Sequence, residues 1–273
     1  MTPIHEQTVL VTGATDGLGK GVALDLARRG ATVLVHGRDA ARIAQTVGEI
    51  ARASPRGAVR SYRADFASLA EVRAMAADLV ANERRIDGLV NNAGIGTTVP
   101  GGPARQESAD GHELRFAVNY LAPYLLTRLL LPTLRASAPA RVVNVSSAGQ
   151  QSIDFDDVML RRGYGGVRAY CQSKLAQILF TIDLADELRV AGVSVNALHP
   201  ATFMPTKIVS SPTSTLAEGV DATVRLVVDP SLDGVSGQYF DGSRETRANG
   251  QAYDKVARQK LRALSESLAG VGP

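Results

Sequence analysis

The sequence has few cysteines and aromatic residues. It contains one cysteine, Cys171, and no tryptophan, and aromatic residues make up 5% of its 273 residues. One cysteine excludes an internal disulfide and a thiolate-rich metal cluster. The four histidines are scattered, with no pair at helical spacing to chelate zinc. We therefore expect no metal site; the histidines are His5, His36, His112 and His199.

Long apolar runs and a strong excess of one charge are also missing. The most apolar stretch, YLAPYLLTRLLLPTL (120–134), contains Arg128 and two prolines, so we expect no membrane span. The chain starts MTPIHEQTVLVTG, without a basic leader or a cleavage site, which favours a cytoplasmic protein. The net charge is +3 with both signs interspersed, and this argues against a nucleic-acid partner.

Short β-rich runs alternate with helix-length amphipathic segments along the chain. Several of the β-rich runs are almost continuous Val, Ile and Leu, as in strands covered on both faces. The alternation implies right-handed crossovers and a parallel sheet. The sequence predicts one doubly wound α/β domain over 1–273, with a central seven-stranded parallel sheet and helices on both faces. The expected strands are 8–12, 31–37, 58–64, 86–92, 140–146, 192–199 and 236–242, and the expected helices are 18–29, 39–53, 68–82, 109–136 and 168–190.

A glycine-rich stretch, TGATDGLGKG, follows the first expected strand and leads into the first helix. Gly13, Gly17 and Gly19 permit a tight turn, close approach of backbone N–H groups to a pyrophosphate and close packing of the helix on the strand. The amino end of the helix adds unpaired N–H groups and a partial positive charge. The Gly-x3-Gly-x-Gly spacing resembles the nucleotide loop of the classical short-chain dehydrogenase/reductase family, whose members are single Rossmann domains of about this length.

The resemblance implies a nicotinamide dinucleotide cofactor, and the second strand indicates which one. An NAD site usually carries an acid about 20 residues beyond the loop, where this chain has Gly37 followed by Arg38. Glycine removes charge repulsion there, and arginine offers a planar cation for a 2′-phosphate. Asp39 is the counter-argument, although capping the next helix is its more natural role. We predict NADP(H) in preference to NAD(H).

Two further segments match the family at the ends of later strands. Asp65, in RADF, falls where classical members hold the adenine edge, and it could equally cap a helix. NNAG (91–94) resembles the family signature that stabilises the central sheet and lines the cofactor cleft. The complete set of expected cofactor-binding residues is Gly13, Thr15, Asp16, Gly17, Leu18, Gly19, Gly37, Arg38, Asp65, Phe66, Asn92, Ala93, Gly94, Tyr170, Lys174, Pro200 and Thr206.

The expected catalytic group comes from three segments. Tyr170 and Lys174 in AYCQSK share one face of a helix, a spacing that also arises by chance in ordinary helices. Together with Asn119 in AVNYLAPYLLT and Ser147 after the fifth strand, they match the family's Asn–Ser–Tyr–Lys tetrad. We prefer Ser147 to Ser146 because the family aligns the second serine of such a pair. All four residues, Asn119, Ser147, Tyr170 and Lys174, are therefore expected to be catalytic.

The tetrad implies a division of roles. Free tyrosine has a pKa near 10, and a nearby lysine ammonium together with the oxidised nicotinamide favours tyrosinate. Ser147 is expected to donate a hydrogen bond to the substrate oxygen, and Asn119 to hold a water that passes protons out through Lys174. Cys171 should point about 100° away from Tyr170 on the helix, and we expect it to be a small buried side chain.

The sequence departs from the family pattern after the sixth strand. In NALHPATFMPT, Pro200 resembles the start of the Pro-Gly segment that covers the nicotinamide, but Ala201 replaces the glycine. One residue appears extra before Thr206, so either Thr202 or Thr206 is expected to bind the carboxamide, with Thr206 preferred. The segment 202–217 is expected to be a lid over the substrate, and a plain surface loop is the competing interpretation.

An insertion between Ser147 and Tyr170, with SKLAQILFT and the carboxyl-terminal region, resembles the branch that contains retinol dehydrogenases and related carbonyl reductases. The likeness runs roughly from residue 7 to 268 and implies an NADP-dependent oxidoreductase. The alternative is an NADP(H)-sensing binding protein without turnover. A sugar-nucleotide epimerase or dehydratase of the extended branch of the family fits the sequence poorly. Apolar side chains and the lack of a cation cluster favour a moderately apolar ketone, aldehyde or secondary alcohol. Helices 109–136 and 168–190 form the family's usual dimer face, so a homodimer or homotetramer is possible, although the insertion could obstruct it. The apolar side chains are Phe155, Met159, Tyr164, Phe203 and Met204.

Overall fold

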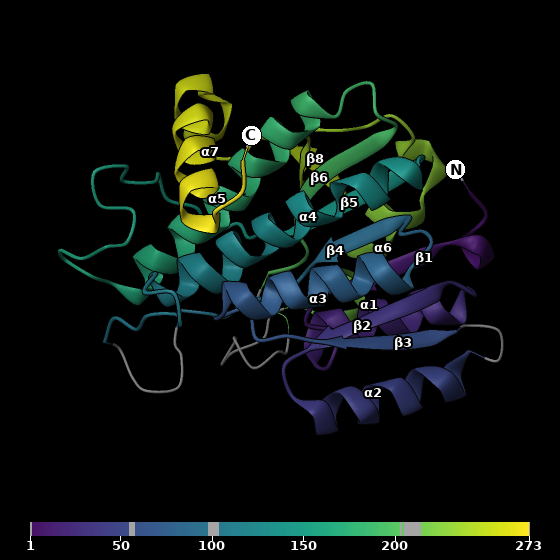
Figure 1. The fold of residues 1–273 in the computed structure, drawn as a ribbon. Coiled ribbons are helices and arrows are strands. Elements are labelled where there is room, and N and C mark those ends of the chain that lie inside the picture. The colour runs from purple at the N-terminus through teal and green to yellow at the C-terminus, as the bar shows by residue number, and fades with distance from the viewer. Residues whose placement is uncertain (1, 55–57, 98–103, 203, 205–213, 273) are drawn as a thin grey trace.

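The computed structural model describes residues 2–54, 58–97, 104–202, 204 and 214–272 (Figure 1). One sheet runs through them in the strand order β3-β2-β1-β4-β5-β6-β7-β8. The predicted seven parallel strands are confirmed, and β8 joins the edge in antiparallel direction. The strands are β1 (Thr8–Val11), β2 (Thr32–Gly37), β3 (Val59–Arg63), β4 (Gly88–Asn91), β5 (Ala140–Val145), β6 (Val193–His199), β7 (Tyr239–Asp241) and β8 (Arg244–Thr246).

The eighth strand was not predicted, and a tight turn produces it. Gly242 has φ 59°, a left-handed conformation, and it follows β7 directly. A glycine at the first central position suits a two-residue hairpin turn, so the chain folds straight back onto β7. The sequence prediction extended the seventh strand over 236–242, whereas the structure keeps only Tyr239–Asp241 in it.

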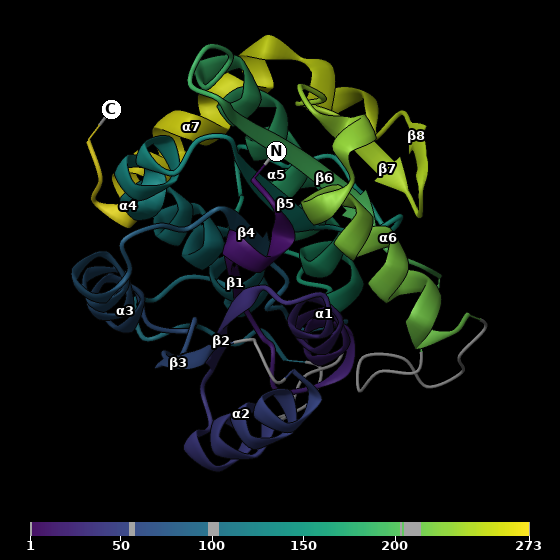
Figure 2. The same ribbon diagram turned by 90° about the vertical axis from the view of Figure 1, so that its right-hand side faces the viewer.

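Helices cover both faces of the sheet (Figure 2). On one face, side chains of α3, α4, α5 and α7 form a hydrophobic core with the sheet, and on the other face α1 and α6 form a second core to which α2 contributes Ile50. Each face is therefore apolar, which explains the nearly continuous Val and Leu of the central strands. The α-helices are α1 (Gly17–Arg28), α2 (Ala40–Ala53), α3 (Leu69–Asn82), α4 (Ala122–Ala136), α5 (Gly166–Glu187), α6 (Leu216–Val228) and α7 (Lys255–Ala269).

Shorter helical turns complete the described structure. A π-helical turn over Phe116–Leu121 leads directly into α4, and 3-10 turns occupy Ile4–Glu6, Pro230–Leu232 and Gly250–Tyr253. The predicted helix over 109–136 is therefore wrong at its start. Gly111 has φ 78° and Glu113 forms an isolated β-bridge with Glu107, and neither conformation fits an α-helix.

The topology fixes where a ligand can approach the sheet. From β1 the chain proceeds to β2 and β3 on one side and then returns to β4 on the other. In a doubly wound sheet the crevice at this reversal opens at the carboxyl ends of the strands. The glycine loop after β1, the Asn92–Gly94 segment after β4 and the serines after β5 all lie at this end.

The carboxyl-terminal helix packs on the helices that were expected to form a dimer face. Tyr120 and Ser265 share a hydrogen bond of 2.6 Å between their hydroxyl oxygens, and Arg262 Nε donates to Asp183 at 2.6 Å. Helix α7 lies beside α5 in Figure 1. Among the described residues, no helix combines the length and the apolar character needed to cross a membrane.

Candidate active site

The glycine loop is shaped by left-handed backbone and by close contacts. Gly13 and Gly17 have φ values of 65° and 50°, and a Cβ atom on Gly19 would overlap with the carbonyl of Gly13. Asp16 begins α1, because its Oδ1 accepts a hydrogen bond from Gly17 N at 2.9 Å. Leu18 is buried in the core shared with α6. The amino end of α1 therefore lies at the carboxyl end of β1, and its role as a phosphate site stays a prediction.

A buried histidine, His36, connects the glycine loop to the backbone just after β3. Gly13 N donates to His36 Nδ1 at 3.1 Å, so Nε2 carries the proton and donates to Ala64 O at 3.1 Å. Burial lowers the pKa of His36 to about 4, so the imidazole is neutral at neutral pH. This role of His36 was not predicted from the sequence. The available signal was a polar residue at the end of an otherwise apolar strand, TVLVHG.

Phe66 faces the protein interior. Its ring is 4% exposed and stacks on His36 with 4.3 Å between ring centroids. Asp65 Oδ1 accepts from Ala67 N at 2.9 Å and so closes the turn before α3. The cap of α3 is Ser68, whose hydroxyl accepts from Glu71 N. The alternative that Asp65 caps the helix is therefore wrong, and its place at the adenine edge stays a prediction.

The end of β2 brings arginines together. A Cβ atom on Gly37 would lie 2.6 Å from Thr15 Cγ2, so glycine here lets the loop pack against the strand. Asp39 caps α2, and the hydrogen bond that it accepts from Arg42 N holds the pKa of its carboxyl below the usual value. Arg63 Nε donates to the carbonyl of Arg38 at 3.0 Å. Arg38, Arg42 and Arg63 are all exposed at this corner.

The Asn92–Gly94 segment ties β4 to β1. Asn92 Nδ2 donates to Thr12 O at 2.8 Å, and the N–H groups of Asn92 and Ala93 both donate to Thr12 Oγ1. A Cβ atom on Gly94 would come within 3.2 Å of Asn119 Oδ1 and 3.7 Å of Lys174 Nζ. A glycine at this position therefore leaves room beside the two polar groups at the floor of the crevice.

Tyr170, Ser147 and Lys174 meet at the carboxyl end of β5. The Ser147 side chain lies close enough to the Tyr170 hydroxyl to lower its pKa, and Lys174 Nζ lies 5.8 Å from the centroid of the Tyr170 ring. Ser147 Oγ accepts from Gly149 N at 3.0 Å, and its carbonyl accepts from Tyr239 OH at 3.0 Å. Ser146 Oγ instead donates to Lys174 O at 2.7 Å. Of the two serines, only Ser147 therefore faces the tyrosine.

The protonation of this group is set mainly by burial. Burial raises the pKa of Tyr170 above 10, and the hydrogen bond with Ser147 opposes that increase. Burial lowers the pKa of Lys174 to about 7. Lys174 is not among the groups that shift the pKa of Tyr170 in this structure, so the expected lowering by the lysine stays a prediction.

Asn119 connects three elements from within the π-helical turn. Its Oδ1 accepts from Ile95 N at 2.8 Å, and its Nδ2 donates to Ile95 O and to Ser173 Oγ. The side chain is fully buried and joins the segment after β4 to α5. Its predicted role in holding a water stays a prediction.

A buried ionic cluster, which was not predicted from the sequence, anchors the insertion. Arg115 is 1% exposed and donates to Gly96 O, Thr97 O and Tyr164 OH, and Tyr164 donates to Glu113 at 3.2 Å. This cluster joins the residues just before the π-helical turn, the segment after β4 and the end of the insertion. It lies directly before α5, which carries Tyr170. No signal in the sequence distinguished Arg115 from a solvated arginine.

The remaining predicted positions lie near β6 or in α5. Pro200 is buried at the end of β6, and Thr202 Oγ1 lies 3.0 Å from His199 Nε2. Thr206, Phe203 and most of the predicted lid are outside the described residues. Cys171 is half-buried rather than buried, and burial raises the pKa of its thiol. A raised pKa disfavours the thiolate, which agrees with a role outside catalysis.

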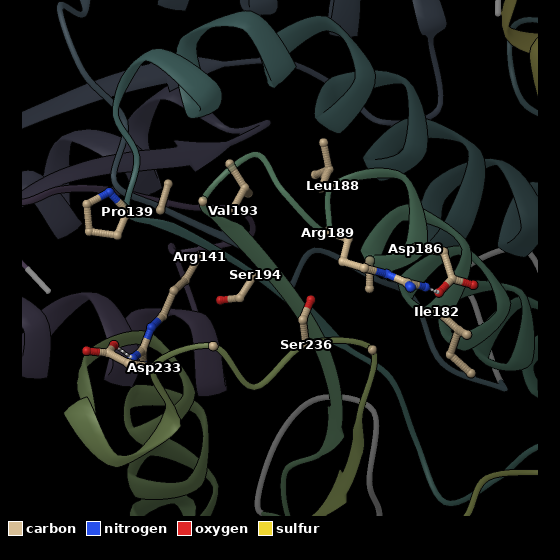
Figure 3. A pocket seen from close by; sticks show the side chains of 15 residues that line it. Pro139, Arg141, Ile182, Asp186, Leu188, Arg189, Val193, Ser194, Asp233 and Ser236 are labelled. Atoms are coloured by element: carbon tan, nitrogen blue, oxygen red, sulfur yellow. Dashed lines mark hydrogen bonds and ion pairs between the residues drawn. The ribbon is translucent and has the colours of Figure 1, made fainter.

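A cavity of about 570 Å³ lies at the other end of the sheet, at the amino ends of β5 and β6 (Figure 3). Its charged side chains are paired, Arg141 with Asp233 and Arg189 with Asp186. None of the predicted site residues lines it. The described residues also contain no group of three side chains suited to a metal ion. The candidate active site is therefore the crevice at the carboxyl ends of the strands.

Comparison with known proteins agrees with this geometry. Residues 7–216 match the family model for short chain dehydrogenases. The chain is 38% identical to human retinol dehydrogenase 13, with 98% of this chain and 86% of that protein covered, and 35% identical to human retinol dehydrogenase 14, with 98% and 88% covered.

Two solved structures extend the comparison to the fold. A short chain dehydrogenase from Shigella flexneri complexed with NADP is 26% identical, with a TM-score of 0.70 and 87% of this chain and 97% of that chain covered. The RhlG/NADP active-site complex from Pseudomonas aeruginosa is 26% identical, with a TM-score of 0.70 and coverage of 88% and 97%. The chain belongs to the short-chain dehydrogenase/reductase family and is an oxidoreductase of alcohol and carbonyl groups that uses a nicotinamide dinucleotide.

Proposed function

We propose that the protein interconverts a moderately apolar ketone or aldehyde and the corresponding alcohol with NADP(H), and that Tyr170 is the general acid and base. The observation that supports this most directly is the proximity of Ser147 to Tyr170, with Lys174 near the tyrosine ring, at the carboxyl end of β5. This is the position at which a doubly wound sheet binds its ligand.

The residues of the crevice fit a dinucleotide. Glycine at Gly13 and Gly19 lets the loop pack closely on itself and on the segment after β4, and Gly94 leaves space beside Asn119 and Lys174. Hydride transfer to or from the substrate carbon is the chemistry that the nicotinamide supplies when bound. We propose that Lys174, whose Nζ would lie 3.7 Å from a Cβ atom at Gly94, also holds the ribose hydroxyls next to the nicotinamide.

In the proposed reduction, the protein supplies the proton and stabilises the developing negative charge. Ser147 donates a hydrogen bond to the carbonyl oxygen, and Tyr170 transfers its hydroxyl proton to that oxygen as hydride reaches the carbon. The products are the alcohol and a tyrosinate, and the Lys174 ammonium stabilises the tyrosinate until it is reprotonated. In the oxidation, the tyrosinate accepts the proton of the alcohol.

The preference for NADP(H) rests on the corner at the end of β2. Arg38, Arg42 and Arg63 are exposed there, and Gly37 replaces the acid that would bind a ribose 2′-hydroxyl. Asp39 is engaged as the cap of α2. A 2′-phosphate would therefore meet guanidinium groups, which bind phosphate oxygens in a planar fork.

The substrate proposal rests on likeness and on chemistry. The relatives named retinol dehydrogenase suggest an apolar alcohol or aldehyde as a starting point. Phe155 and Met159 are partly buried against the hydrophobic core, and Tyr164 is bonded to Arg115, so these side chains serve packing as well as any pocket. The cytoplasmic location stays a prediction. The same holds for a homodimer or homotetramer, in which α7 would lie over part of the expected face.

The test is a turnover assay with matched variants. Purified protein is mixed with NADPH or NADH and a panel of ketones, aldehydes and quinones that includes retinal, and the loss of absorbance at the nicotinamide band is followed. We expect turnover with NADPH and an apolar carbonyl, lost in Tyr170→Phe and retained in Tyr253→Phe. Tight NADPH binding without turnover on any substrate would instead favour a nucleotide-sensing protein.

A further inference from the structure

The ammonium of Lys174 is held by two oxygen acceptors inside the protein. Lys174 is 5% exposed, and its Nζ donates to Val145 O at 2.9 Å and to Gln177 Oε1 at 3.1 Å. No carboxylate within the described part of the chain forms an ion pair with it. An ammonium buried without a counter-ion depends on such dipoles for its charge. The Gln177 amide is the only side-chain acceptor recorded for it among the described residues.

Gln177 is an unusual residue for its position on α5. It is 2% exposed, and Ile178 and Leu179 beside it are fully buried and apolar. Its Oε1 faces the ammonium, while its Nε2 is buried and has no hydrogen-bond partner among the described residues. An unpaired buried donor destabilises the folded protein. A leucine of similar size would avoid that cost, so packing alone does not explain the amide.

We propose that Gln177 is a positioning residue that holds the Lys174 ammonium at the end of β5, beside Tyr170. The amide lies three residues beyond Lys174 on the same helix, a spacing that brings the two side chains together. Its carbonyl dipole favours the charged form of the lysine, whereas burial lowers the pKa of Lys174 to about 7. The balance between these two effects sets the charge of Lys174 near neutral pH.

The other groups around Lys174 leave this role to Gln177. From α5 the ring of Tyr170 lies near the ammonium, and from β5 the Val145 carbonyl accepts a hydrogen bond from it. Gly94, in the segment after β4, and Asn119, in the π-helical turn, lie on a further side. Tyr170 is the only one of these that titrates. The catalytic consequence rests on the proposed function: a Lys174 that loses its charge stabilises tyrosinate less, and oxidation of the alcohol then requires a higher pH.

The first measurement is the titration of Lys174 itself, which needs no substrate. The chain has five lysines, so NMR of protein labelled with [ε-13C]lysine gives a small set of signals, and Lys174→Arg identifies the relevant one. We expect Gln177→Leu to lower the pKa of Lys174 by about one pH unit, the equivalent of a lost hydrogen bond to a charged group. Gln177→Glu should raise it, because a carboxylate would replace a dipole.

The control is another buried glutamine of the same helix. Gln172 is 3% exposed and its Nε2 donates to Ser152 O at 3.1 Å, away from Lys174. Gln172→Leu should leave the Lys174 titration unchanged, although it removes a buried amide of equal size. A general loosening of α5 would move Lys174 in the same direction in all of these variants, whereas the proposal requires opposite shifts in Gln177→Leu and Gln177→Glu.

The outcomes separate this proposal from the proposed function. If the Lys174 titration is the same in wild type and in both Gln177 variants, or moves the same way in both, the role of Gln177 is refuted. If the titration moves as expected, Gln177 is confirmed as the partner of Lys174. The pH dependence of alcohol oxidation then tests the chemistry separately. If the pH profile of the Gln177 variants is the same as that of wild type although the pKa of Lys174 has shifted, the Tyr170–Lys174 mechanism is contradicted and the role of Gln177 still stands.

Discussion

His36 and Lys174 are two buried bases at the same end of the sheet, one beside the glycine loop and the other beside Tyr170. Burial lowers the pKa of both, to about 4 for His36 and to about 7 for Lys174. Their partners differ. His36 meets one donor, Gly13 N, and one acceptor, Ala64 O. Within the part of the chain that the structure describes, Lys174 donates to two acceptors, Val145 O and Gln177 Oε1, and meets no donor.

The difference shows how hydrogen-bond partners decide what a buried base can do. A neutral imidazole satisfies one donor and one acceptor, so His36 is suited to hold two segments of backbone together and not to change charge. An ammonium needs acceptors on every side, so the surroundings of Lys174 favour the charge that burial opposes. His36 therefore stays neutral at pH 7 and holds the glycine loop, whereas the charge of Lys174 changes near neutral pH.

The largest expected effect comes from replacing Lys174. Lys174→Met should lower the turnover number about 1000-fold, within the range of general acid–base catalysis, because the tyrosinate loses its neighbouring cation. The measurement is steady-state kinetics with the best substrate of the panel. His36→Gln, which keeps one donor and one acceptor, should change the turnover number less than threefold. A Lys174→Met variant that retained a tenth of the activity would contradict the proposed mechanism.

The second effect is on stability in acid and belongs to His36. Its pKa is about 4 in the folded protein and 6.5 as the ordinary value, so the unfolded chain binds a proton first as the pH falls. The contribution of the neutral His36 to the free energy of unfolding should therefore be complete above pH 6.5. It should be lost as the pH falls from about 6.5 to 4, which lowers the free energy of unfolding by about 3 kcal/mol. Urea denaturation of wild type and His36→Gln measures this, since the variant cannot titrate there. Parallel curves for the two proteins would show that His36 does not contribute.

A smaller effect is expected from replacing Arg38, one of the exposed arginines at the end of β2. Arg38→Ala should weaken NADPH binding about tenfold and leave NADH binding unchanged, because only NADPH carries the 2′-phosphate. Calorimetry measures both dissociation constants, and the turnover number at saturating NADPH should stay the same. Arg52→Ala, an exposed arginine in the last turn of α2, is the matched control. Equal losses for NADPH and NADH in Arg38→Ala would refute the cofactor preference.

The fold was largely predictable because its signals are local. Continuous Val and Leu runs marked the parallel strands, and the expected helices begin and end within a few residues of α1, α2, α3 and α5. The start of the helix before α4 was predicted wrongly, since the bridge between Glu107 and Glu113 competes with helix formation. The hairpin that forms β8 was missed because a three-residue edge strand carries no periodicity of its own.

The residues of the candidate site also differ in whether the sequence could predict them. The glycine spacing and the i, i+4 relation of Tyr170 and Lys174 are properties of a loop and of a helix, and they could be found from the sequence. The roles of His36, Arg115 and Gln177 depend on partners that the sequence does not identify. A polar residue in an apolar segment is visible, but whether it meets a donor, an acceptor or water depends on the packing of other elements.

The sequence by itself determined the doubly wound topology, the dinucleotide loop and the identity of the candidate catalytic side chains, because each follows from residue type and short-range spacing. Only the tertiary structure decided which serine faces Tyr170, which groups hold Lys174 and how far burial shifts the pKa of each base. Desolvation and hydrogen bonding are set by neighbours from distant segments, and those neighbours come together only when the strands and helices pack.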